Sequence, residues 1–185
     1  MACSFSGPLF AHANPATGGF SAGLLHPVLG FDHLLAMVSV GVVSAQIGGR
    51  SIWLIPLIFV SAMLMGGMTG IYGIPIPYFS IEQGIAASVL ILGLAIAADR
   101  SVPVILISLF VGFFGIFHGH AHGLEMPENA LPVLYITGFI CGTASLHILG
   151  VIIGLLSKKS SQTSLLLRFV GSAIAGIGVS IMFLR

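Results

Sequence analysis

The polar side chains that could do chemistry in this sequence gather in three places. The first is the stretch from His26 to His33, which brings two imidazoles and the carboxylate of Asp32 into an apolar run. The second is Glu82, and the third is the segment from His118 to Glu125. Imidazole and carboxylate groups together suit divalent transition metals such as nickel, cobalt, zinc or copper. The residue types therefore point to a metal site.

The spacing within the third segment favours chelation. His118 and His122 are separated by four residues, so they share a face if the helix continues through them, while His120 points elsewhere. His147 stands alone in a later apolar stretch, where a second station along an ion path and a neutral histidine bonded to a neighbouring helix are equally good explanations. Glu82 equally fits a metal ligand or a favourable charge at a helix N-terminus.

The composition is that of an integral membrane protein. Of the 185 residues, 57% are hydrophobic and only 6% are charged, and the mean hydropathy is +1.13. A charged side chain within a membrane span costs from about 2.5 kcal/mol, so Asp32 needs a partner, and the nearest candidates are histidines. A formal net charge of +1, with no basic cluster larger than Lys158-Lys159, argues against nucleic acid as a partner.

The sequence predicts an all-α, polytopic bundle of about six transmembrane helices. We expect the first helix to open at His26 with Pro27 in its first position, after a loop over 14–21. Gly66 and Gly70 have the spacing of a helix-packing motif. We expect residues 1–17 to form a leader-like stretch and loop, in which Ala11-His12-Ala13 resembles a cleavage site. Residues 18–185 are expected to form a single transmembrane domain. The six expected spans are 26–48, 52–73, 81–98, 102–117, 131–156 and 165–184.

The basic residues predict the orientation. They fall in the connections after the first, third and fifth spans, and the positive-inside rule places these connections in the cytoplasm. The N-terminus and the metal-ligand candidates then lie on the extracytoplasmic side, and Arg185 alone breaks the rule. The basic residues that define this side are Arg50, Arg100, Lys158 and Lys159, together with Arg168 at the start of the sixth expected span.

Three polar blocks resemble the HupE/UreJ family of membrane proteins, which accompany nickel enzymes such as hydrogenase and urease. They are His26-Pro27-x-x-Gly30-x-Asp32-His33, Glu82-x-Gly84-Ile85-Ala86-Ala87-Ser88, and His118-Gly119-x-Ala121-His122-Gly123-x-Glu125, with Leu146-His147 resembling the family's fifth span. The resemblance implies a secondary permease for nickel, or for cobalt. It assigns a candidate role in metal capture and transfer to His26, Asp32, His33, Glu82, His118, His122, Glu125 and His147.

We therefore expect a transporter in a plasma or bacterial inner membrane, with nickel as its first cargo and cobalt as its second. No Walker A string is present, and we expect neither enzymatic activity nor a permanently bound cofactor. The partners are the metal ion and the bilayer, and homo-oligomerisation is left open. Two alternatives use the same ligands: a membrane enzyme with a fixed catalytic metal, and a haem-binding bundle with His33, His118 or His147 as axial ligands.

Overall fold

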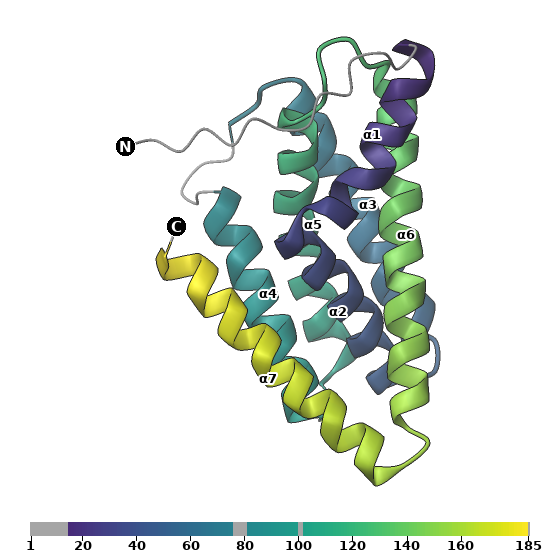
Figure 1. Ribbon diagram of the computed structural model, residues 1–185, viewed down its shortest axis with the longest axis vertical. Coiled ribbons are helices and arrows are strands. Elements are labelled where there is room, and N and C mark those ends of the chain that lie inside the picture. Colours follow the sequence, from purple (N-terminus) through teal and green to yellow (C-terminus); the bar gives the residue numbers. More distant parts are fainter. Residues whose placement is uncertain (1–14, 76–80, 100–101, 185) are drawn as a thin grey trace.

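The computed structural model describes residues 15–75, 81–99 and 102–184, and these ranges form seven α-helices (Figure 1). Five of them, α3 to α7, are long and apolar enough to cross a membrane, and the bent pair α1 and α2 adds a sixth candidate span. The predicted helical membrane bundle of about six spans is therefore confirmed. The helices are α1 (Pro15–Leu29), α2 (Phe31–Ile47), α3 (Ser51–Ile71), α4 (Ile81–Ala98), α5 (Val104–Leu124), α6 (Pro132–Ser157) and α7 (Ser161–Leu184).

The first span is broken, and here the sequence prediction was wrong. The expected loop over 14–21 is helical from Pro15 onward, and Pro27 lies inside α1 rather than at a helix start. The chain then turns by 79° at Gly30 before α2 begins. Proline removes the hydrogen bond to the carbonyl four residues earlier and kinks the preceding turn, so Pro27 weakens α1 between Gly23 and Pro27, shortly before it ends at Leu29. The predicted start at His26 is in fact the last turn of a preceding helix.

Packing against α6 explains why α1 forms in a segment rich in weak helix formers. A side chain at Gly23 would collide with the backbone of Tyr135 and Phe139, so α1 lies directly on the first half of α6. Gly41 of α2 approaches the backbone of His147 in the same way. Tertiary packing thus outweighs the low helix propensity of glycine. Consequently α1 and α2 follow one another along α6, and the break between them is set off from α6 toward the inside of the bundle (Figure 1).

Close contact between α3 and α5 fixes the position of the histidine-bearing helix. A side chain at Gly66 would meet the carbonyl of Ile116, and one at Gly119 would meet the carbonyl of Met63. The predicted packing role of Gly66 and Gly70 is confirmed, since Gly70 lies against the carbonyl of His120. The helix α5 also continues through Leu124, so the segment that carries the histidines is helical.

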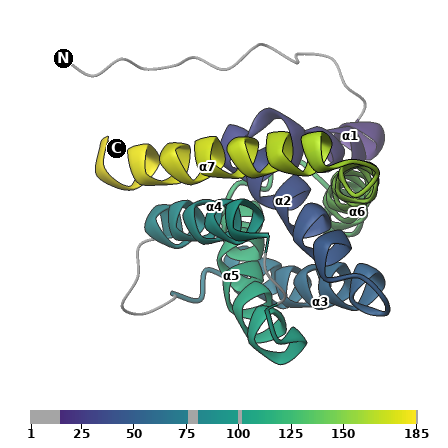
Figure 2. The same ribbon diagram turned by 90° about the horizontal axis from the view of Figure 1, so that it is seen from below.

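Polar contacts join α2, α4 and α7 at the end of the bundle where α2 and α4 end and α7 begins. Asp99 accepts hydrogen bonds from the Gln46 amide at 3.0 Å and from the Ser164 hydroxyl at 3.0 Å. The helix α7 begins at Ser161, before the predicted Leu165, because Ser160 and Thr163 cap it with reciprocal backbone bonds of 3.1 and 3.2 Å. Seen from below, α2 lies in the middle of the bundle, and it contacts α3, α4, α5 and α6 (Figure 2).

Candidate metal site

Three imidazoles meet at the break in the first span. His26 lies in the last turn of α1, His33 in the first turn of α2, and His122 near the end of α5. One ligand nitrogen from each lies within 4.8 Å of the other two. The ring centroid of His122 is 4.6 Å from that of His26 and 4.8 Å from that of His33. We call these three residues the histidine triad, and their spacing is compatible with one shared ion.

Asp32 orients one member of the triad. Its Oδ1 accepts a hydrogen bond from the backbone N–H of His33 at 2.9 Å and another from the Nδ1–H of the same residue at 3.0 Å. The Nε2 of His33 is then unprotonated and carries a lone pair. This nitrogen is buried and has no hydrogen-bond partner in the described part of the chain. A carboxylate behind a histidine is the usual arrangement at protein metal sites, where it fixes the ring and makes the ligand nitrogen more basic.

Glu125 holds the outer member of the triad. Its Oε2 accepts a hydrogen bond from the Nε2 of His26 at 2.7 Å, and its side chain is 53% exposed just beyond the end of α5. This hydrogen bond keeps the pKa of Glu125 below its ordinary value, against the opposing effect of partial burial. The carboxylate is therefore ionised at neutral pH. The His26 side chain is 26% exposed, so the triad is most accessible at His26.

His122 is fully buried, and its ring nitrogens make no hydrogen bonds to the described residues. Its ring stacks on Phe139 with centroids 5.0 Å apart and an interplanar angle of 4°. Neither ring nitrogen has a hydrogen-bond partner among the residues of known placement, although an uncompensated buried polar group costs about 1–3 kcal/mol. His118 lies one helical turn away, and its ring is 4.9 Å from that of His33. A cation bound between these rings would relieve part of that cost.

The remaining predicted site residues are placed differently. Glu82 is exposed in the first turn of α4 and is not a member of the triad. His147 is buried on α6, and the ring of Phe59 contacts both it and His118, with centroid distances of 5.4 and 5.5 Å. His120 contacts α3, where its Nδ1 is 2.8 Å from the Thr69 hydroxyl.

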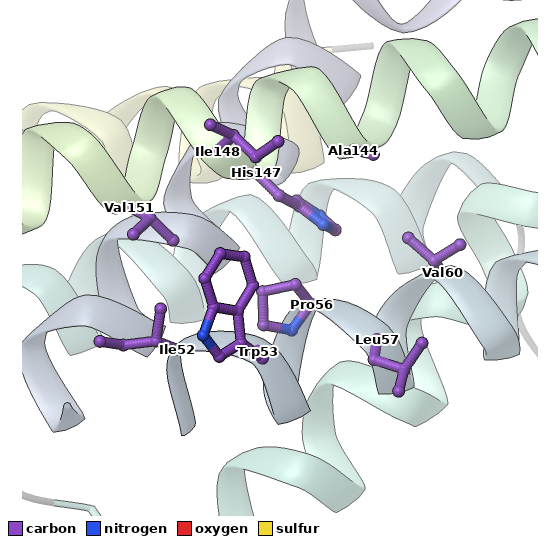
Figure 3. Close-up of a pocket in the computed structure, with 9 residues that line it drawn as sticks. All are labelled: Ile52, Trp53, Pro56, Leu57, Val60, Ala144, His147, Ile148 and Val151. Carbon is purple, nitrogen blue, oxygen red and sulfur yellow. The ribbon is translucent and has the colours of Figure 1, made fainter. Parts of the chain in front are cut away.

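His147 also borders a pocket of about 340 Å³ between α3 and α6. Figure 3 shows its ring projecting from α6 toward α3, near Pro56. His147 follows Phe139 by eight residues on α6, which corresponds to roughly 12 Å at a rise of 1.5 Å per residue. His147 is thus well separated along the bundle from the ring on which His122 stacks. The pocket is lined by Ile52, Trp53, Pro56, Leu57, Val60, Ala144, His147, Ile148 and Val151.

Sequence reasoning missed two residues of the site. Ser88 on α4 contacts the Nε2 of His118 at 2.9 Å, and Phe139 on α6 supports His122. Ser88 stands in the same polar block as Glu82, so its position six residues further along could have suggested it. Phe139 carries no such signal, because a phenylalanine in an apolar helix is ordinary.

The fold and the site together define an integral membrane protein with a histidine and carboxylate cluster inside its helical bundle. The chain matches the model of the HupE / UreJ protein family over residues 1–181. It is also 39% identical over 178 residues to Protein HupE of Rhizobium leguminosarum bv. viciae, a match that covers 95% of this chain and 91% of that relative. The chain belongs to the HupE/UreJ family, which confirms the resemblance drawn from the motifs. No solved structure matches it.

Proposed function

We propose that this protein is a secondary permease that carries a divalent transition metal inward across the membrane, nickel first and cobalt second. It acts without enzymatic chemistry and without a permanently bound cofactor, because the metal is the cargo. The observation that carries the proposal is the histidine triad, whose ligand nitrogens lie within 4.8 Å of one another at a break in an apolar span. Family membership supports the same function, since the family accompanies nickel enzymes.

Capture begins at the exposed edge of the triad. An incoming hydrated cation meets Glu125 and His26 first, and it exchanges water for imidazole as it reaches His33 and His122. Two carboxylates, Asp32 and Glu125, flank the triad and match the charge of a divalent ion. Such pairing offsets the cost of placing a cation in a low-dielectric interior.

The break itself contributes to cation binding. Discontinuous membrane helices commonly place substrate and ion sites near the bilayer midplane, where the C-terminal end of one half-helix directs carbonyl oxygens toward a cation. Here α1 ends at Leu29, between His26 and His33 of the triad. The carbonyl groups at the C-terminal end of α1 therefore favour a cation, while Asp32 accepts the N–H of His33 at the opposing N-terminal end of α2.

Passage inward then follows the remaining buried histidines. His118 lies next to His33, and His147 follows beyond Phe59. A divalent ion that falls through 100 mV gains about 4.6 kcal/mol, at about 2.3 kcal/mol per charge, so the membrane potential suffices as a driving force. Arg50, Lys158 and Lys159 follow the C-terminal ends of α2 and α6, and the positive-inside rule then assigns the triad to the extracytoplasmic half.

Radiolabelled nickel uptake into proteoliposomes with an inside-negative potential tests this function. We expect His33→Ala and His122→Ala to abolish uptake, because each removes one ligand of the triad. His120→Ala is the matched control, since it removes a buried histidine from the same helix that bonds to Thr69 instead. Parallel uptake of cobalt ranks the two cargoes. Normal uptake by both triad variants, or tightly held nickel that does not exchange, would contradict a permease.

A further inference from the structure

The hydrogen bonds of Ser88 determine which nitrogen of His118 is free to bind a metal. The Ser88 hydroxyl lies 2.7 Å from the carbonyl oxygen of Ile85 and 2.9 Å from the Nε2 of His118. A carbonyl oxygen can only accept, so the single hydroxyl proton is donated to Ile85. The hydroxyl oxygen must then accept the hydrogen bond from His118, which carries its proton on Nε2.

A neutral imidazole protonated on Nε2 has its lone pair on Nδ1. The Nδ1 of His118 is buried and has no hydrogen-bond partner among the described residues, and the residue is 0% exposed. The same holds for the Nε2 of His33, since Asp32 binds the Nδ1–H of that ring. The two nitrogens with unpaired lone pairs, Nδ1 of His118 and Nε2 of His33, therefore belong to rings whose centroids are 4.9 Å apart.

We propose that Ser88 is a positioning residue that holds His118 as the Nε2–H tautomer, so that His118 Nδ1 and His33 Nε2 form an inner metal position beside the histidine triad. His118 precedes His122 by one helical turn, roughly 6 Å along α5, and because both positions use the Nε2 of His33, the two metal positions lie closer together than that. His33 is shared between the two positions. The ion moves inward by exchanging His26 for His118 while His33 stays bound, which deepens the proposed permease function and rests on it.

The tautomer of His118 is the first test, and it needs neither metal nor transport. In the full-length protein labelled with ¹⁵N-histidine, the signal that disappears in His118→Ala reports the protonated nitrogen of this ring. We expect protonation at Nε2 in the wild type, and a shift toward Nδ1–H in Ser88→Ala. Protonation at Nδ1 in the wild type would overturn the proposal, whatever the variants do.

Nickel binding to the purified protein is the second test. Loss of a residue that supports a metal ligand typically weakens affinity 10–100-fold, which is the range we expect for Ser88→Ala, with recovery in Ser88→Thr. Ser44→Ala is the matched control, because Ser44 is equally buried and its hydroxyl donates to the carbonyl of Gly41 at 2.7 Å rather than bonding to a histidine of the described chain. Unchanged affinity in Ser88→Ala, or equal loss in Ser44→Ala, would overturn the positioning role.

These results separate the inference from the proposed function. If nickel binding depends on Ser88 but the wild type moves no nickel across the membrane, the inner position stands and the permease function fails. If the wild type transports nickel and Ser88→Ala neither alters the His118 tautomer nor weakens binding, the function stands and the inner position fails.

Discussion

Replacing Asp32 by asparagine isolates the charge behind the triad. The carboxylate accepts two hydrogen bonds from His33, at 2.9 and 3.0 Å, and the amide oxygen of asparagine can accept the same two. A hydrogen bond to a charged group contributes about 1.5–3 kcal/mol and a neutral one about 0.5–1.5 kcal/mol. Between the midpoints of these ranges the difference is about 1.25 kcal/mol per bond, and for the Nδ1–H bond of the ligand ring this corresponds to roughly an eightfold weaker affinity of His33 for nickel.

Asp32→Ala should have a larger effect. It leaves the Nδ1–H of His33 without an acceptor, so the ring is free to rotate or to change tautomer. We therefore expect nickel affinity to fall toward the upper end of the roughly 10–100-fold range for residues that support a metal ligand. The ordering of the wild type, Asp32→Asn and Asp32→Ala separates loss of charge from loss of orientation.

Equilibrium dialysis of radiolabelled nickel against the purified protein at neutral pH measures both effects. Asp99→Asn is the matched control, because Asp99 bonds to Gln46 and Ser164 at the other end of α2. Its nickel affinity should equal that of the wild type. The reasoning is refuted if Asp32→Asn binds nickel as tightly as the wild type, or if Asp99→Asn weakens binding to the same extent.

Three further predictions concern acid stability, helix packing and passage. Because the hydrogen bond from His26 lowers the pKa of Glu125, the thermal stability that Glu125 adds over Glu125→Gln should be constant above its ordinary value of 4.5 and disappear as the pH falls through the lowered pKa. Gly119→Ala should reduce the free energy of unfolding by about 1–3 kcal/mol through overpacking and so lower the melting temperature. Gly176→Ala, whose added methyl group meets no atom within 4 Å, should not lower it. His147→Leu should leave nickel affinity at the triad unchanged but slow uptake into proteoliposomes; equal uptake would exclude His147 from the path.

Several parts of the site could be predicted because they depend on local spacing. His118 and His122 lie four residues apart, and the structure places both rings against His33, as the shared helical face required. Gly66 and Gly70 pack α3 on α5, as their spacing indicated. The hydrogen bond between His26 and Glu125 could not be predicted from spacing, because it joins the ends of α1 and α5. His12, in the predicted cleavage site, lies outside the described residues.

The sequence alone determined the number of spans, the apolar character of the bundle and the types of the candidate ligands. These properties follow from hydrophobicity added along successive residues, and burial in lipid depends on that sum. Only the tertiary structure decided that the first span breaks at Gly30 and that Ser88 meets His118. The position of a break depends on contacts such as that of Gly23 with Tyr135, between helices far apart in the chain, and no local pattern encodes which helices will meet.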